Sequence, residues 1–283
     1  MATKNGRALV LGGGGVVGVA WELGVLAALD EHGIDVTAAD HVYGTSAGAA
    51  VGALLGSGLP VRELLTRQTT SQANGDTPSA TAVAKMMTTW LRLSSEVADP
   101  RERIRQIGAL ALTAETKPEA QHRAEIAAHL PSQSWPRTPL TITAVDARTG
   151  ELRLFDRQSG ATLAEAVAAS VAVPMVWPPI TFDGNSYIDG GMRSATNADL
   201  AAGHARVLIL APMPDPELAD QIALLSRTAQ VETIVPNAAS VAAFGTNPLD
   251  PAVRARAAQA GHDQGRAAAA TIRDTWLGGS ARS

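Results

Sequence analysis

The chain has 283 residues, of which 46% are hydrophobic and 18% are charged, a composition typical of a globular protein and not of a disordered one. Its net charge of -4 gives no reason to expect nucleic acid as a partner, and the absence of cysteine excludes disulfides, thiol nucleophiles and cysteine metal sites. The N-terminus lacks the apolar region of a signal peptide, and no uninterrupted apolar run of about 18 residues exists. We therefore expect a soluble, cytoplasmic protein without a transmembrane segment.

The first part of the chain alternates between strand and helix patterns. Residues 7–11 form a short apolar run that ends in four glycines, as in a buried strand that enters a tight turn. Apolar residues then recur at helical spacing over 16–32, and Gly33 supplies a stop. A second strand is predicted over 40–43 and a second helix as far as about residue 55. This alternation predicts a parallel sheet covered by helices.

Residues 61–135 contain no convincing strand, and we predict a helical insertion over the sheet, with helices that include 101–112 and 118–130. An earlier helix of the insertion carries an apolar stripe at helical spacing. The stripe consists of Val83, Met86, Met87, Trp90 and Leu91. Such a stripe is typical of a helix that faces the core. A lid or a peripheral membrane-contacting face is the alternative, because Met and Trp suit contact with acyl chains.

The remaining segments are predicted to complete the sheet and to add a long final helix. Strands are expected at 140–145, 152–155 and 207–210, a hairpin over 180–187 that turns at Asp183-Gly184-Asn185, and helices over 162–170 and from Asp250 to about Leu277. Thr162 and Glu165 are spaced as in a capping box. We place residues 1–283 in one domain, with a core over 7–211 and a C-terminal helical segment, 212–283, that packs on it.

The sequence Gly44-Thr45-Ser46-Ala47-Gly48 stands between the second predicted strand and the helix that follows it. In that context Gly-x-Ser-x-Gly is a nucleophile elbow, a strained turn that lifts the serine hydroxyl out of the sheet. Gly44 and Gly48 would let strand and helix approach closely, and the helix directs its positive end at the alkoxide. Ser46 is therefore the candidate nucleophile.

A serine nucleophile needs a base, and the histidines that follow Ser46 are poorly placed to serve as one. They are His122 and His129 in the helical insertion, His204 before a strand, and His262 in the final helix. Each is predicted to be a surface or packing histidine. Asp189 is the better base, because it ends a strand and precedes Gly190 and Gly191, which would let another backbone come close. An ordinary Asp-Gly-Gly turn is the alternative.

The glycines from 12 to 18 allow two functional interpretations. Gly13-x-Gly15-x-x-Gly18 satisfies the dinucleotide-binding fingerprint, although the next strand ends without the acidic residue that would hold a ribose. The N–H groups of Gly13, Gly14 and Gly15 could instead form an oxyanion hole at a helix N-terminus. A plain tight turn between strand and helix is the third possibility.

Three motifs in this order resemble those of the patatin-like phospholipases: Gly-Gly-Gly-x-x-Gly at 13–18, Gly-Thr-Ser-Ala-Gly at 44–48 and Tyr-Ile-Asp-Gly-Gly at 187–191. The resemblance covers about residues 7–211, is weakest over 61–135, and includes the segments 145–152 and 166–179. It implies a patatin-like three-layer α/β/α fold with a mostly parallel central sheet and a helical insertion.

The resemblance also implies an activity and the residues that carry it. It implies a serine acyl hydrolase that cleaves phospholipid or glyceride esters through a Ser–Asp dyad, with no metal or organic cofactor. Ser46 would be the nucleophile, Asp189 the proton acceptor, and the amides of Gly13 to Gly15 the oxyanion hole. The family commonly has Arg or Lys at the position of Val17, and this departure makes a catalytically inactive lipid carrier one alternative. A nucleotide-binding protein is the other. Head group, chain length and oligomeric state are not predicted.

Overall fold

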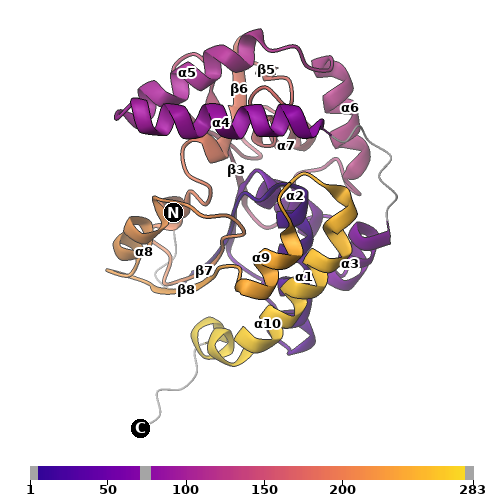
Figure 1. Ribbon diagram of the computed structural model, residues 1–283. Coiled ribbons are helices and arrows are strands. Elements are labelled where there is room, and N and C mark those ends of the chain that lie inside the picture. The colour runs from indigo at the N-terminus through magenta and orange to yellow at the C-terminus, as the bar shows by residue number, and fades with distance from the viewer. Residues whose placement is uncertain (1–5, 71–77, 278–283) are drawn as a thin grey trace.

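The computed structural model describes residues 6–70 and 78–277. Within these ranges one eight-stranded sheet has helices on both faces, which gives a three-layer α/β fold (Figure 1). The strand order is β5-β6-β3-β2-β1-β7-β8, with β4 paired to β3. The pairs from β3 through β2, β1 and β7 to β8 are parallel, whereas β4, β5 and β6 add antiparallel pairs. The sheet is therefore mixed and mostly parallel, as predicted.

The helices and strands have the following bounds. The strands are β1 (Arg7–Leu11), β2 (His41–Thr45), β3 (Leu140–Asp146), β4 (Leu152–Phe155), β5 (Ile180–Phe182), β6 (Asn185–Asp189), β7 (Arg206–Leu210) and β8 (Gln230–Ile234). The α-helices are α1 (Gly15–Glu31), α2 (Ala47–Leu55), α3 (Val61–Thr70), α4 (Ala80–Glu96), α5 (Pro100–Thr113), α6 (Glu119–His129), α7 (Leu163–Ser170), α8 (Leu218–Leu225), α9 (Ala238–Phe244) and α10 (Arg254–Leu277). Short 3₁₀ helices are η1 (Gly190–Met192), η2 (Ala198–Ala201) and η3 (Pro251–Val253). None of the described helices combines the length and the apolar composition needed to cross a membrane.

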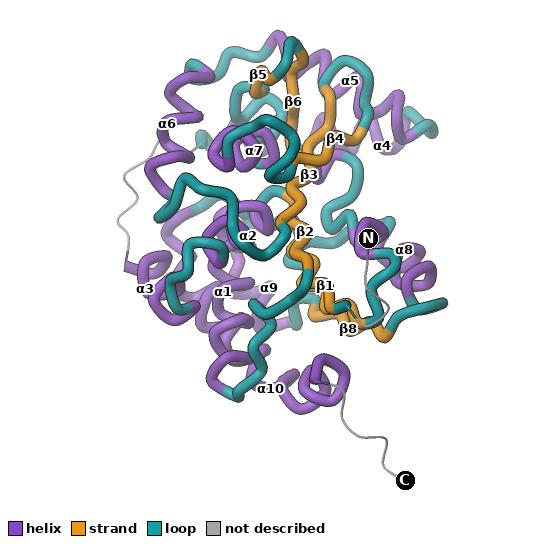
Figure 2. Tube along the Cα trace, turned by 180° about the vertical axis from the view of Figure 1, so that it is seen from behind, coloured by secondary structure: helices purple, strands orange, loops and turns teal. Residues whose placement is uncertain are grey.

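The two faces of the central strands bury different side chains, because successive residues of a strand point to opposite sides. Leu9 and Leu11 join the large core cluster that also contains side chains of α1, α2, α7 and α10. Ala8 and Val10 pack on the other face with residues of η2 and α8. Figure 2 shows the strands edge-on, with α1, α2 and α7 on one side and α4, α5 and α8 on the other.

Several local predictions are confirmed. The chain opens as strand, helix, strand, helix, and β3 and β4 form the expected antiparallel hairpin. The hairpin of β5 and β6 turns at Asp183 and Gly184, both with positive φ, which suits a two-residue turn. Thr162 and Glu165 make both hydrogen bonds of a capping box at the start of α7.

Other features differ from the prediction for physical reasons. Pro251 and its two successors form the 3₁₀ turn η3, so α10 begins at Arg254 and not directly after Asp250. Strand β8 was not predicted, because its sequence, Gln-Val-Glu-Thr-Ile, lies at the sheet edge and only Ile234 is buried. Helices α8 and α9 are short and were also missed.

Helix α1 is buried on nearly all sides and not along one stripe, because α10 lies beside it (Figure 1). Glycines permit this approach. A Cβ added to Gly24 of α1 would lie 2.2 Å from the Ala258 carbonyl oxygen, and one added to Gly261 of α10 would lie 2.2 Å from the Trp21 carbonyl oxygen. Farther along α10, the Trp276 indole is buried and donates to the Asp35 carbonyl oxygen at 3.1 Å. The C-terminal helix is thus part of the core that holds α1 in place.

Candidate active site

The pairing of β3 brings the ends of two other strands together. Residues 142 and 143 of β3 pair with both β2 and β4, and residues 144 and 145 pair with both β4 and β6. A strand has two edges, so β2 and β6 share one edge of β3. Thr45 lies opposite Thr143 and Asp189 opposite Ala144, and the two strands run in opposite directions. Their C-terminal ends therefore meet, which places Ser46 beside Asp189.

Ser46 occupies a sharp turn between β2 and α2. Its φ of 52° lies in the left-handed region, which costs energy for a residue with a side chain. A Cβ added to Gly48 would lie 2.0 Å from the Leu11 carbonyl oxygen, and one added to Gly44 would lie 2.7 Å from Ala49 Cα. Gly44 and Gly48 thus allow α2 to lie close to β2 and β1, as expected for a nucleophile elbow. The Ser46 N–H donates to the Ser170 hydroxyl at 2.9 Å, which ties the turn to the end of α7.

Ser46 and Asp189 form a direct hydrogen bond. The Ser46 hydroxyl donates to Asp189 Oδ2 at 2.6 Å, and the Gly191 N–H donates to Asp189 Oδ1 at 2.7 Å. Only 7% of Ser46 and 3% of Asp189 are exposed. Burial raises the pKa of Asp189 to about 6, although the bonds from Ser46 and Gly191 act to lower it. At neutral pH the carboxylate is mostly ionised and close enough to accept the serine proton.

A buried polar network supports both residues from behind. Asn197, with φ 49°, donates from Nδ2 to the Thr45 hydroxyl at 3.1 Å and to the Gly190 carbonyl oxygen at 3.3 Å. A Cβ at Gly190 would lie 2.3 Å from the hydroxyl of Thr143, so this position requires glycine. Asn197 thereby links the residue before Ser46 to the residue after Asp189. Neither Asn197 nor Ser170 was predicted, because no local motif marks them.

The glycine turn between β1 and α1 lies next to Ser46. A Cβ added to Gly13 would lie 3.5 Å from Ser46 Cβ. The Gly13 N–H donates to the Ala195 carbonyl oxygen at 2.7 Å, so it is occupied. The N–H groups of Gly14, Gly15 and Ala47 have no acceptor within residues 6–70 and 78–277. Of these three residues, Gly15 and Ala47 line the cavity beside Ser46, and Gly14 directly precedes Gly15.

A cavity of about 240 Å³ opens at Ser46. Most of its lining is apolar and comes from α1, α2, α6 and the loop after α7, including Val19, Ala50, Leu54, Ile126, Leu130 and Trp177. Besides Ser46, the polar lining residues are Gln68, His122, Glu125, His129 and Arg254. Elements far apart in the sequence, from the glycine turn to the start of α10, thus enclose one pocket beside the serine.

The four histidines after Ser46 take packing or surface positions. His122 is buried and stacks on Trp177, with ring centroids 5.1 Å apart, and burial lowers its pKa to about 4. His129 is exposed, His204 lies near His41, and His262 contacts Glu31. Among the described residues, no histidine hydrogen-bonds to Ser46 or Asp189. His122 and His129 nevertheless line the cavity, which their place in the insertion did not predict.

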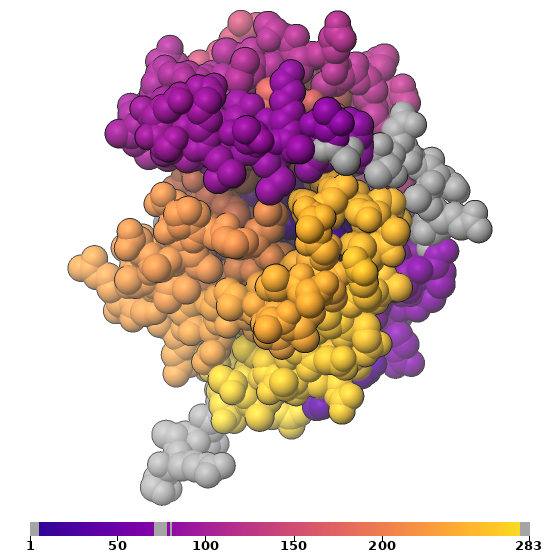
Figure 3. All heavy atoms as spheres, viewed as in Figure 1, coloured from indigo at the N-terminus to yellow at the C-terminus, as the bar shows by residue number. Residues whose placement is uncertain are grey.

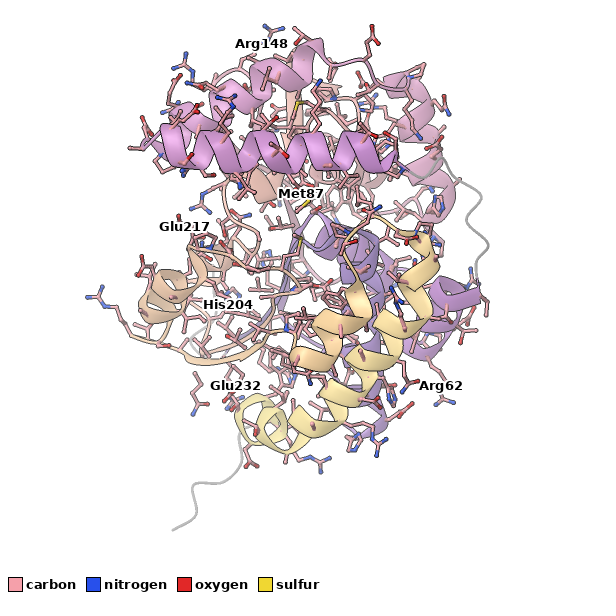
Figure 4. All side chains as sticks on the ribbon, viewed as in Figure 1. Arg62, Met87, Arg148, His204, Glu217 and Glu232 are labelled. Carbon is pink, nitrogen blue, oxygen red and sulfur yellow. The ribbon has the colours of Figure 1, made fainter. Side chains whose placement is uncertain are left out.

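The apolar stripe on α4 divides between core and surface. Val83 is buried and packs with Val176 and Leu249, whereas Met87 and Leu91 are 41% and 67% exposed. Figure 4 shows Met87 at the edge of α4 that faces the lower part of the molecule. In Figure 3 the surface is hollowed between α4 (purple) and the yellow-orange C-terminal segment. The core-facing interpretation thus holds for Val83 and for the partly buried Met86 and Trp90, which also pack against buried clusters. Met87 and Leu91 are open to solvent.

Comparison with known proteins identifies the family. The model of the patatin-like phospholipase family matches residues 9–202. The chain belongs to the patatin-like phospholipase family. The patatin-like segment contains the glycine turn, Ser46 and Asp189, and it ends before β7 and the C-terminal helices. Within the described residues, no three His, Asp or Glu side chains are grouped so as to hold a metal ion.

Solved structures similar to this patatin-like chain include two bacterial effectors. VipD from Legionella pneumophila has a TM-score of 0.47 and 16% identity, over 94% of this chain and 67% of VipD. The type III effector ExoU has a TM-score of 0.43 and 17% identity, over 95% of this chain and 54% of ExoU. ExoU in its complex with SpcU from Pseudomonas aeruginosa has a TM-score of 0.42 and 15% identity, over 98% of this chain and 52% of that ExoU chain. The chain thus spans about two thirds of VipD and about half of ExoU.

Proposed function

We propose that this protein is a serine acyl hydrolase that cleaves the ester bond of a lipid, either a phospholipid or a glyceride, through a dyad of Ser46 and Asp189. The observation that carries the proposal is the 2.6 Å hydrogen bond from the Ser46 hydroxyl to the buried Asp189 carboxylate, beside a cavity with a mostly apolar lining. Membership of the patatin-like phospholipase family supports the lipid substrate.

In the acylation step, Ser46 Oγ attacks the ester carbonyl carbon while its proton passes to Asp189 Oδ2. The carbonyl oxygen becomes an oxyanion on a tetrahedral carbon. When this intermediate collapses, the bond to the alcohol oxygen breaks, and the alcohol leaves with the proton from Asp189. The products of this half-reaction are an acyl ester of Ser46 and the free alcohol.

In the second half-reaction, water attacks the acyl carbonyl and gives its proton to the Asp189 carboxylate. Collapse of the second tetrahedral intermediate breaks the bond to Ser46 Oγ, which takes the proton back, and the fatty acid leaves. Each cycle consumes one water and restores both residues. The Gly191 N–H, which donates to the other carboxylate oxygen, keeps Asp189 oriented throughout.

We assign the oxyanion hole to the N–H groups of Gly14, Gly15 and Ala47. Gly14 and Gly15 stand at the N-terminus of α1 and Ala47 at that of α2, where helix dipoles favour negative charge. Gly13, which we also predicted as a donor, would contribute only if its bond to the Ala195 carbonyl oxygen opened. The oxyanion is then stabilised by backbone donors without a cation at Val17, which is buried in the core.

The acyl chain would occupy the apolar part of the cavity, and the exposed Met87 and Leu91 of α4 would contact the lipid surface from which the substrate comes. We also propose that residues 1–283 act as one domain, because α10 packs directly on α1. The cytoplasmic location stays a prediction.

Turnover of p-nitrophenyl esters of increasing chain length tests the proposed function. Wild-type protein should release p-nitrophenol, and Ser46→Ala should lower kcat by a factor of about 10³ or more. Ser226→Ala, an exposed serine at the end of α8, is the matched control and should keep wild-type turnover. Full activity in Ser46→Ala would contradict the proposal, and a wild type that binds but never cleaves lipid would favour the inactive carrier. A thermal shift caused by NAD(P) that survives Ser46→Ala would favour nucleotide binding.

Ser170→Ala is expected to lower kcat about tenfold with little change in KM. The substitution removes the hydroxyl that accepts the Ser46 N–H, so a buried donor at the strained turn loses its partner. Steady-state kinetics on a p-nitrophenyl ester measure the effect. Ser240→Ala, which also changes a fully buried serine but on α9, controls for a general loss of packing. Equal kcat and KM values in Ser170→Ala and wild type would show that Ser170 does not help to position Ser46.

A further inference from the structure

The cavity beside Ser46 contains a cation from outside the patatin-like segment. Arg254, the first residue of α10, lines the cavity together with Gly15, Val16 and Ser46. The chain before it is held against the glycine turn, because the Val17 N–H donates to the Pro248 carbonyl oxygen at 3.1 Å. Val253 also packs with Val17 in the core. The fold thus fixes the backbone of Arg254 next to the glycine turn.

Arg254 has no partner among the described residues. It makes no hydrogen bond or ion pair there, and its Nε atom is buried without an acceptor. Burial lowers the pKa of the Arg254 guanidinium, and no carboxylate offsets this effect. Arg193 is different, because its guanidinium binds Asp199 at 2.7 Å and its pKa is raised. A half-buried guanidinium with open donors is costly unless an anion meets it.

The nearby carboxylates are already engaged. Glu125 lines the same cavity but accepts from Lys117 at 2.6 Å. Asp250 accepts the Ala252 N–H at 2.9 Å, and Asp189 is bound to Ser46 and Gly191. The positive charge of Arg254 does not stabilise α10 either, because a cation at a helix N-terminus interacts unfavourably with the helix dipole. Neither ion pairing nor helix stability therefore accounts for this arginine.

We propose that Arg254 is the residue that selects an anionic substrate, by binding a phosphate group of the lipid while the scissile ester lies at Ser46. The inference rests on the proposed function and names its substrate class: an ester with an apolar acyl chain and a negatively charged phosphate. The planar guanidinium can donate two parallel hydrogen bonds to such a group. The N–H groups of Gly14 and Gly15 remain available for the oxyanion, so the two negative charges meet separate donors.

Two short-chain lipids with the same acyl chains test this assignment: the anionic dihexanoyl-phosphatidylglycerol and the neutral dihexanoylglycerol. Arg254→Gln is expected to lower the ratio of their kcat/KM values about 10- to 100-fold, the effect of losing a charge-assisted hydrogen bond. Arg254→Lys should recover part of the ratio. Arg256→Gln makes the same charge change at an exposed position of α10 and should keep the wild-type ratio. An unchanged ratio in Arg254→Gln would overturn the proposal.

Inhibition by inorganic phosphate distinguishes a subsite for free phosphate from a subsite for the phosphate group of the lipid. If the subsite takes free phosphate, phosphate will inhibit hydrolysis of the neutral lipid in the wild type and not in Arg254→Gln. If phosphate does not inhibit, a lower ratio of kcat/KM for the anionic over the neutral lipid in Arg254→Gln assigns the subsite to the lipid phosphate. Calorimetric titration of Ser46→Ala with dihexanoyl-phosphatidylglycerol covers the case in which no ester is cleaved. If adding Arg254→Gln to Ser46→Ala weakens binding of this lipid at least tenfold, the phosphate subsite is supported even where the proposed hydrolysis fails. If the affinity is unchanged, the subsite itself is contradicted.

Discussion

Asp189→Asn is expected to lower kcat for ester hydrolysis by a factor of about 10³ to 10⁴ and to make the folded protein more stable at pH 8. Activity is lost because an amide cannot accept the Ser46 proton. The fold is retained because asparagine can accept the Gly191 N–H through its oxygen and donate to Ser46 Oγ through its nitrogen. The variant thus separates the chemistry of residue 189 from its structural role.

The gain in stability follows from the sign of the pKa shift. The folded-state pKa of Asp189 is raised from 3.8 to about 6, so below pH 3.8 the residue is protonated in both states and costs nothing. Between about pH 3.8 and pH 6 the unfolded state releases this proton while the folded state retains it, so the wild type loses stability over that range and levels off above it. A shift of about two units corresponds to roughly 3 kcal/mol, which Asp189→Asn should recover at pH 8 and not at pH 4.

Ester kinetics and urea unfolding at pH 4 and pH 8 check both parts of this expectation. Asp183→Asn, at the exposed turn between β5 and β6, is the control for the same chemical change. It should alter neither kcat nor the pH dependence of the free energy of unfolding. Wild-type kcat in Asp189→Asn would contradict the role of Asp189 as proton acceptor. A stability difference that is equal at both pH values would contradict the raised pKa.

Gly261→Ala is expected to destabilise the protein by about 3 kcal/mol or more and to reduce activity with it. An alanine methyl at this position would lie 2.2 Å from the Trp21 carbonyl oxygen, so α10 would have to move away from α1. Helix propensity acts in the opposite direction, since alanine in place of glycine favours a helix by about 1 kcal/mol. We expect the steric effect to dominate, because the clash is with backbone in a packed core.

Urea unfolding of Gly261→Ala against wild type measures the outcome. Gln259→Ala, at an exposed position two residues earlier, is the control for a new alanine in α10 and should stay near wild-type stability. A Gly261→Ala protein that is more stable than wild type would mean that α10 does not constrain α1. The glycine turn at the start of α1 would then not depend on the C-terminal helix.

Sequence patterns predicted those parts of the fold whose signals are local. The apolar run of β1, the alternation with β-branched residues in β3, the capping box at Thr162 and the turn at Asp183-Gly184 each depend on a few neighbouring residues. Ser46 and Asp189 were named for the same reason, because each lies in a short motif, and the structure brings these two residues together. Their meeting depends on the register of β2 and β6 on β3, which the sequence does not display.

The features that escaped prediction depend on contacts between distant segments. Gly13 has the same local pattern as Gly14, and only the position of Ala195 shows that its N–H is occupied. Asn197 and Ser170 reach the serine turn from other elements, and Arg254 reaches the cavity from the start of α10. The burial of α1 on nearly all sides likewise follows from its contact with α10, a segment distant in the sequence.

The most direct test of the Ser46–Asp189 dyad is covalent labelling with a fluorophosphonate, followed by peptide mapping by mass spectrometry. A fluorophosphonate reacts with an activated serine and leaves its phosphonyl group on the hydroxyl oxygen. We expect one adduct on the wild-type protein, located at Ser46, absent in Ser46→Ala and formed much more slowly in Asp189→Asn. Labelling at a different serine, or equal rates in Asp189→Asn and wild type, would contradict it.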